Sequence, residues 1–205
     1  MGYAHLLERR FIQVRRNPGR ALRVMHGLVW GLILKSVFRV TNPNVKIGRQ
    51  FRAYGRLRIR GPGRVIIGDR ACVTKGFLRT PCILTHTPDS EVVLGDGCNL
   101  SGTRISSISS VVVGRDAVLA STTIADSLMI PAPDQEIDRQ WQQRYVRKVR
   151  IGRHFWAGAN SFVAGGAEVG DECVLGAGAV LLGGKEYPPC SLLMGNPARR
   201  IGEAR

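Results

Sequence analysis

A period of six residues dominates the C-terminal part of the chain. Aliphatic or small residues head six consecutive hexads: Ile151, Ala157, Val163, Val169, Leu175 and Leu181. Glycines punctuate the same stretch: Gly152, Gly158, Gly165, Gly170 and Gly176. This repeat matches neither the 3.6-residue period of an α-helix nor the two-residue alternation of a simple strand. It therefore predicts an all-β solenoid of short parallel strands.

The predicted solenoid is a three-sided prism. Each hexad forms one short strand and one corner, and three hexads complete a coil. The head of each hexad points inward and stacks on its counterpart in the next coil. The residue two places earlier also points inward and must be small, as at Ala71, Cys98 and Cys173. Earlier fragments keep the period in shifted frames, which indicates insertions between them: Ile47, Ala53, Ile59 and Val65, then Val73, Leu94, Leu100, Val113, Leu119 and Ala125.

Composition and cysteines narrow the class of protein. The chain has 205 residues, 25 of them Gly and only 6% aromatic, which fits poorly with a helical bundle. The five cysteines are Cys72, Cys82, Cys98, Cys173 and Cys190. They form no CxxC pair and no metal-ligand cluster, so we expect no metal site and interpret them as small core hydrophobes. Without a secretory signal pattern, the expected compartment is the reducing cytoplasm.

Positive charge is concentrated in the first part of the chain. Residues 1–80 contain 18 Lys and Arg but only Glu8 and Asp69 as acids, whereas residues 81–205 contain 12 basic and 13 acidic residues. Within this part, residues 5–40 are predicted to be a basic amphipathic helical arm. Its longest apolar run, 28–34, is too short to span a bilayer. The arm suits an anionic membrane surface, or packing on its own domain or a sister subunit; nucleic acid is the weaker alternative, because no recognition motif accompanies the charge.

The repeat region resembles the left-handed β-helix, or hexapeptide-repeat, acyltransferases, and most closely the branch that O-acetylates sugars and surface polysaccharides. Three segments carry the resemblance: residues 151–160, 169–180 and 188–201. The resemblance implies a left-handed parallel β-helix over residues 43–205, preceded by the basic arm over residues 1–42. It also implies a homotrimer with acetyl-CoA in a groove between neighbouring solenoids.

The resemblance further implies which residues meet the donor. The pantetheine arm of acetyl-CoA would lie along small residues, the adenine beside a proline, and the phosphates near basic side chains. The matching positions are Gly158, Ala159, Gly176, Ala177, Lys185, Pro197, Arg199 and Arg200.

A polar segment interrupts the hexads at residues 127–150 and is predicted to be a loop that leaves the coil and covers the acceptor. Just before such a loop, the sugar branch commonly has an Asp followed closely by a His that serves as general base. Asp126 matches, but Leu128 or a neighbour stands where the His is expected. Three candidates for the base remain: His86, His154, and Asp126 itself if burial favours its protonated form.

These features predict an acetyl-CoA-dependent transferase acting on a sugar hydroxyl of a surface polysaccharide or lipid-linked glycan precursor. The protein would be cytoplasmic, or peripheral on the inner face of the membrane. Two alternatives stay open. One is a catalytically degenerate scaffold in a membrane glycan-synthesis complex, which the missing His favours. The other is a sugar N-acetyltransferase, because a neutral amine needs less help from a base.

Overall fold

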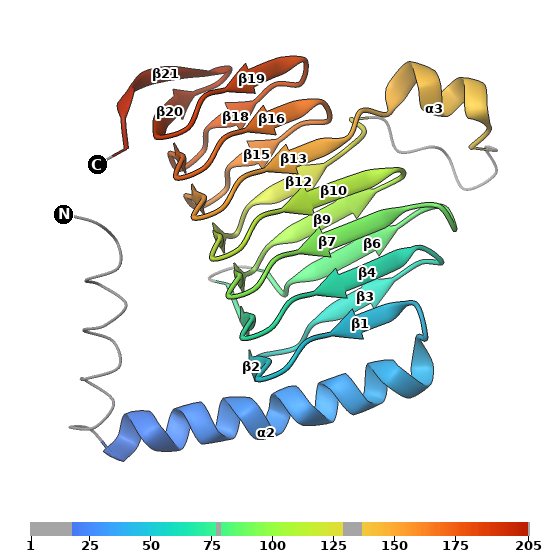
Figure 1. The fold of residues 1–205 in the computed structure, drawn as a ribbon, viewed down its shortest axis with the longest axis vertical. Helices are drawn as coiled ribbons and strands as arrows, with labels where there is room; N and C mark the ends of the chain where they lie inside the picture. The colour runs from blue at the N-terminus through green and yellow to red at the C-terminus, as the bar shows by residue number, and fades with distance from the viewer. Residues whose placement is uncertain (1–17, 77–78, 129–136, 205) are drawn as a thin grey trace.

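The computed structural model describes residues 18–76, 79–128 and 137–204 and shows one helix followed by a three-sided stack of short strands (Figure 1). Helix α2 (Pro18–Thr41) comes first. Sheet A contains β1 (Val45–Ile47), β4 (Arg64–Ile67), β7 (Glu91–Leu94), β10 (Ser110–Val113), β13 (Val149–Ile151), β16 (Ala167–Val169) and β19 (Lys185–Tyr187). Sheet B contains β2 (Arg52–Tyr54), β5 (Cys72–Thr74), β8 (Asn99–Ser101), β11 (Val118–Ala120), β14 (Trp156–Ala157), β17 (Val174–Leu175), β20 (Ser191–Gly195) and β21 (Ala198–Glu203). Sheet C contains β3 (Arg58–Arg60), β6 (Cys82–Thr85), β9 (Arg104–Ser107), β12 (Thr123–Ala125), β15 (Phe162–Val163) and β18 (Val180–Leu181).

The chain visits sheets A, B and C in turn, and every strand pairing is parallel except that of β20 with β21. Ile151 lies opposite Val169, and Val169 opposite Tyr187, so a coil here spans 18 residues. All six predicted hexad heads are buried, as are Ala71, Cys98 and Cys173 two places before a head. The predicted fold class, a left-handed parallel β-helix preceded by a helix, is confirmed.

The early coils contain insertions, and these fall at particular corners. Ile47 lies opposite Ile67, and Val45 lies opposite Val65. Val65 is therefore the inward residue two places before the hexad head Ile67, and it is not itself the next head after Ile59, as the period of six predicted. The extra residues lie between β3 and β4. By contrast, the step from the inward residue of sheet A to that of sheet B is always six residues, as from Ile67 to Val73 and from Leu94 to Leu100. Insertions therefore enter only at the two edges of sheet C.

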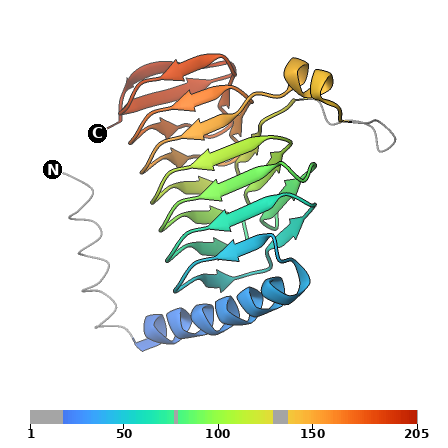
Figure 2. The ribbon, with the colours of Figure 1, turned by 45° about the vertical axis from the view of Figure 1, so that its right-hand side comes forward.

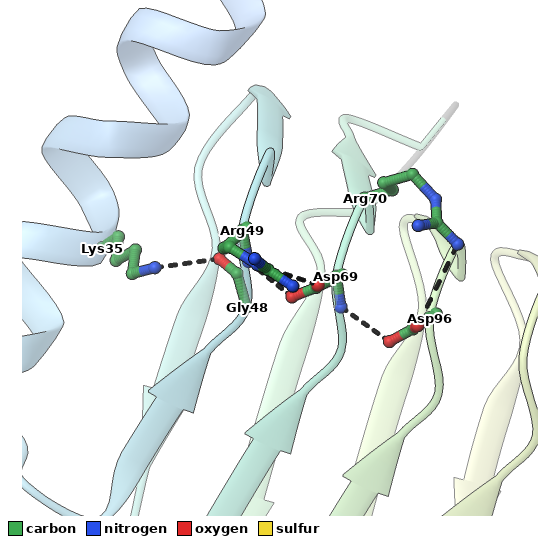
Figure 3. Close-up of polar contacts among 6 residues, drawn as sticks. All are labelled: Lys35, Gly48, Arg49, Asp69, Arg70 and Asp96. Atoms are coloured by element: carbon green, nitrogen blue, oxygen red, sulfur yellow. Dashed lines mark hydrogen bonds and ion pairs between the residues drawn. The ribbon is translucent and has the colours of Figure 1, made fainter.

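The corner between sheets A and B repeats one turn along the stack. Its residues with left-handed φ are Gln50, Arg70, Gly97, Asp116, His154, Glu172 and Cys190. From Arg70 onward, each backbone N–H donates to a carbonyl of the coil before it, as His154 does to Arg115 at 2.8 Å. Carboxylates of the next coil cap further N–H groups: Asp69 accepts from the Arg49 N–H at 2.7 Å, and Asp96 from the Asp69 N–H at 2.8 Å (Figure 3).

Helix α2 lies across the open end of the first coil, where it covers sheet edges that would otherwise be exposed (Figures 1 and 2). Gly27 and Gly31 face the coil, and a Cβ at Gly31 would overlap the carbonyl group of Phe51. Leu34 and Phe38 pack against the core, and the Lys35 Nζ donates to the Gly48 carbonyl at 3.0 Å. At the other end, β21 turns back along β20.

Two sequence expectations are corrected here. Residues Gly19–Thr41 form a helix whose length and hydropathy would suffice to cross a membrane, because basic residues interrupt the apolar run without ending the helix. The interpretation of all five cysteines as core residues is also wrong. Cys82 and Cys190 are only partly buried, since Cys82 alternates with the inward-facing Ile83 and Cys190 occupies a corner.

Candidate active site

The long excursion leaves the stack at the corner between sheets C and A. It begins after β12 and returns at β13, and it carries the short helix α3 (Arg139–Tyr145). Asp138 starts this helix by accepting a hydrogen bond from the Trp141 N–H at 2.7 Å. Trp141 packs with Val146 and Ile108, which fixes α3 over the corner between β9 and β10. In Figure 2 helix α3 lies at the side of the stack.

Asp126 anchors the base of this excursion. Its side chain is buried and its carboxylate accepts three hydrogen bonds, from the Ser107 hydroxyl at 2.8 Å and from the N–H groups of Ile108 and Ser109 at 2.9 and 2.7 Å. Its own carbonyl accepts from the Arg147 N–H at 2.9 Å, which ties the start of the excursion to its end. The Asp126 carboxylate therefore stabilises the backbone of this corner.

His86 lies at the same edge of sheet C, on the outer face. It follows β6, where outward and inward residues alternate, and its imidazole is partly buried. The Nε2 atom shares a hydrogen bond of 2.9 Å with the Ser106 hydroxyl on the neighbouring strand β9. The backbone N–H of His86 donates to the carbonyl of Ser107, the residue whose hydroxyl binds Asp126. His86 and Asp126, 40 positions apart in the chain, therefore border one corner.

Leu128, near the position where a His was expected, cannot take a proton, and its side chain is 68% exposed. The remaining candidate for the base lies elsewhere. His154 occupies a left-handed turn at the corner between sheets A and B, on the far side of the prism from sheet C.

The small residues predicted to meet the donor line the opposite edge of sheet C, its corner with sheet B. Gly158 and Gly176 follow β14 and β17, and a Cβ at Gly158 would lie 2.6 Å from the Ala177 nitrogen. Ala159 and Ala177 beside them are exposed. Pro197 is exposed in the turn after β20, at the same corner one coil further on. Gly158 thus allows close packing of the next coil, and the exposed Ala159 and Ala177 leave small side chains on the surface of this edge.

The basic residues of the predicted donor site do not lie together in the fold. Arg199 and Arg200 are exposed on β21, where Arg200 pairs with Glu203 at 3.5 Å. Lys185 begins β19 on sheet A, next to the edge that carries His86 and Asp126. Within one chain, sheet C therefore separates Lys185 from the edge of small residues.

The outer face of sheet C also carries a basic surface that the sequence pattern did not indicate. Arg58, Arg60 and Arg104 project outward from β3 and β9 and make no ion pair with any described residue. The register sets Arg58 and Arg104 on either side of Cys82, and Arg60 next to Leu84. Only the strand pairing reveals this cluster, because insertions of different length separate the three strands in the sequence.

Sheet A carries two surface hollows. The first, about 420 Å³, is lined by Pro43, Asn44, Lys46, Pro62, Arg64 and Pro88. The second, about 470 Å³, lies near Arg150, Glu168 and Glu186. Neither includes a predicted site residue. Within the described residues, no group of three or more His, Cys, Asp and Glu side chains is arranged to hold a metal ion.

The repeat of this chain matches a known family of repeats. The bacterial transferase hexapeptide family (six repeats) matches residues 148–183, the stretch of unbroken hexads. The chain carries the hexapeptide repeat. The match falls where this hexapeptide-repeat protein has coils of 18 residues, and it stops short of the earlier coils with their insertions.

Two solved structures share the fold. The polySia-specific acetyltransferase NeuO is 17% identical, with a TM-score of 0.55, over 78% of this chain and 82% of that one. AntD, an N-acyltransferase from Bacillus cereus, was solved with dTDP-4-amino-4,6-dideoxyglucose and coenzyme A. It is 14% identical, with a TM-score of 0.58, over 78% of this chain and 83% of that one.

Proposed function

We propose that this hexapeptide-repeat protein transfers an acetyl group from acetyl-CoA to a hydroxyl of a sugar. One observation carries the proposal: sheet C has the exposed small residues Ala159 and Ala177 along one edge and the partly buried His86 at the other. The first edge suits a thin, amide-bearing arm that needs close approach to backbone. The second supplies an imidazole, the side chain that most often serves as a general base. NeuO and AntD, which share the fold, are both acyltransferases.

The proposed step is a direct transfer. The sugar hydroxyl oxygen attacks the thioester carbonyl carbon while its proton passes to the imidazole of His86. The new C–O bond forms as the C–S bond breaks, and the leaving thiolate of CoA takes the proton from the imidazolium. Ser106 orients the ring through the 2.9 Å hydrogen bond. Asp126 keeps the corner in place without exchanging a proton.

The donor would lie along Gly158, Ala159, Gly176 and Ala177, with Pro197 beside the adenine. A side chain larger than methyl at the two exposed alanines would cover the backbone that the pantetheine arm needs. Arg199 and Arg200 on β21, at the end of sheet B, would meet the phosphates. Lys185 lies across sheet C, so it would meet a donor bound to a neighbouring copy.

We further propose a homotrimer, in which the edge of small residues of one subunit faces the His86 edge of the next. The outer surface of the solenoid supports this arrangement. In the C-terminal coils, sheets B and C expose apolar side chains, including Trp156 at 42%, Leu182 at 41% and Met194 at 45%. The outer face of sheet A instead presents Arg150, Glu168 and Glu186 to solvent. Apolar outer faces favour subunit contacts on sheets B and C.

The acceptor would be a surface polysaccharide or a lipid-linked glycan precursor. The arginines on the outer face of sheet C, Arg58, Arg60 and Arg104, support an acceptor that carries phosphate or carboxylate groups, because guanidinium groups bind both through paired hydrogen bonds. A lipid-linked acceptor would bring the reaction to a membrane surface.

A thiol-release assay tests the function. Purified protein, acetyl-CoA and a panel of acidic and neutral glycans should yield free CoA thiol, with the glycan gaining one acetyl ester. Isothermal calorimetry with CoA alone separates the ways of failing. Binding without turnover on any glycan would favour the degenerate scaffold, and no binding would reject both. Turnover on amino sugars with an amide product would favour N-acetylation, which is less dependent on a base.

A further inference from the structure

Helix α2 has two apolar faces, and among the described residues only one of these faces packs against another element. The inner face packs on the first coil through Gly27, Gly31, Leu34 and Phe38. The outer face carries eight large apolar side chains, each between 45% and 84% exposed: Leu22, Met25, Val29, Trp30, Leu32, Ile33, Val37 and Val40. Their spacing of three and four residues places them in one continuous stripe along the helix.

A large positive charge surrounds this stripe. Residues 18–64, which form α2 and the first coil, contain 11 Lys and Arg and no Asp or Glu. Arg23 and Arg39 are exposed on the helix itself. The first acidic residue after this region is Asp69, which is already paired with Arg49 at 3.3 Å. An apolar stripe with basic residues on the same helix, in a region of the chain without acidic residues, complements an anionic phospholipid bilayer, which offers acyl chains below a layer of negative headgroups.

The docking of α2 decides how the helix would meet a bilayer. The close approach of Gly31 to Phe51 and the hydrogen bond from Lys35 to Gly48 hold the helix lengthwise on the first coil. Both views show α2 lying across the end of the stack (Figures 1 and 2). A helix fixed to a polar coil along its length cannot cross the hydrocarbon layer, although its length and composition would suffice.

We propose that the outer face of α2 is an in-plane docking surface for an anionic phospholipid membrane. The helix lies in the headgroup region with its stripe toward the acyl chains, and the solenoid stands on the membrane on its N-terminal end. Nucleic acid would use the basic residues but leave the apolar stripe unused. A second copy would bring two highly positive surfaces together, which like-charge repulsion opposes. This inference does not depend on the acetyl-transfer activity.

Vesicle flotation of the full chain tests the proposal. We expect binding to phosphatidylcholine vesicles that contain about one third phosphatidylglycerol, and at least about tenfold weaker binding to pure phosphatidylcholine. Raising the salt from about 0.1 to 0.5 M should weaken the anionic binding, because screening shortens the range of the headgroup charge. Trp30 fluorescence should shift to the blue on binding, and Trp30→Phe should remove that shift while flotation persists.

Matched variants separate the stripe from the charge. Val29→Glu combined with Ile33→Glu should abolish flotation, whereas Ile201→Glu, on a 60% exposed residue at the opposite end, should leave it intact. Arg23→Gln with Arg39→Gln, which leaves the stripe intact, should reduce the preference for anionic vesicles. Circular dichroism and melting curves should match the parent in each case, since all these side chains are exposed.

Each of the following results would overturn the proposal. One is the absence of flotation with anionic vesicles at millimolar lipid. Another is flotation that survives Val29→Glu with Ile33→Glu. The third is a change of oligomeric state in that variant, measured by light scattering without any vesicle binding by the parent, which would assign the stripe to a second copy. Binding to RNA that depends only on the arginines, without vesicle binding, would equally reject a membrane.

Discussion

The His86 imidazole is held 2.9 Å from the Ser106 hydroxyl, and the residue after that serine binds the buried carboxylate of Asp126. A histidine from one coil, a serine pair from the next and an aspartate from a third thus form one corner of sheet C. The carboxylate organises the backbone of the corner, and the imidazole on its outer face stays available to a ligand. This division of roles generates distinct expectations for the two side chains.

Replacing His86 should affect turnover and not donor binding. For His86→Gln we expect kcat to fall by about 10²–10⁴-fold, the usual contribution of a general base, with little change in the Kd for CoA. Steady-state thiol release and calorimetry measure the two quantities. The same assay on His154→Asn, which keeps a residue that tolerates positive φ, locates the base independently. A larger loss there than at His86 would move the base to the corner between sheets A and B.

Replacing Asp126 should affect stability first. Asp126→Ala would leave the Ser107 hydroxyl and the N–H groups of Ile108 and Ser109 without their acceptor. Because these donors are buried or partly buried, we expect the free energy of unfolding to drop by about 1–3 kcal/mol. Urea unfolding followed by circular dichroism measures it, and the exposed Asp89→Ala is the matched control. Equal stability of the two variants would contradict the structural role of Asp126.

Asp69 should make stability depend on acid pH. Its hydrogen bond from the Arg49 N–H, with the Arg49 and Arg70 charges nearby, lowers the pKa of the Asp69 carboxyl below its usual value of 3.8. A lowered pKa in the folded state means that the ionised form contributes stability above the unfolded pKa, and that this contribution is lost as pH falls through the folded pKa. The stability difference between the parent and Asp69→Asn should therefore be present near neutral pH and vanish in strong acid. Urea unfolding across this range measures it, and a difference independent of pH would refute the assignment.

The buried thiol of Cys98 should be inert. Burial raises the pKa of the Cys98 thiol to about 11, and its Sγ donates to the Gly114 carbonyl at 3.2 Å. The reactive thiolate is thus nearly absent at about pH 8. Iodoacetamide labelling read by mass spectrometry should modify the partly exposed Cys82 and Cys190 well before Cys98. Labelling of Cys98 in the folded protein at their rate would show that its coil opens.

Gly31 should be intolerant of any side chain. A Cβ there would overlap the Phe51 carbonyl, so Gly31→Val must lift α2 from the first coil. Overpacking of this kind typically costs about 1–3 kcal/mol, and thermal denaturation should show a lower Tm. Ser36→Val, on an exposed position of the same helix, controls for the lower helix propensity of valine. Equal melting of the two variants would mean that α2 is not held where the structure places it.

The amino-acid pattern alone is enough to predict the solenoid, because the residue at the head of each hexad must meet the same local requirement. A residue such as Leu175 must fill the same interior position in every coil, and a small residue must precede it, so the period survives in the one-dimensional pattern. The same pattern located the excursion after Asp126 and the small residues at Gly158 and Gly176.

The sequence pattern does not show which of these residues are neighbours in space; the three-dimensional structure is needed for that. Insertions of unequal length enter at the two edges of sheet C, so the distance along the chain does not reveal that His86, Ser106 and Asp126 share a corner. Pairing of the strands sets that register, and it also brings together the arginines on the outer face of sheet C. The sequence likewise does not indicate which face of the apolar helix α2 the first coil covers. The close packing at Gly31 sets that face, and the outer stripe is therefore left exposed.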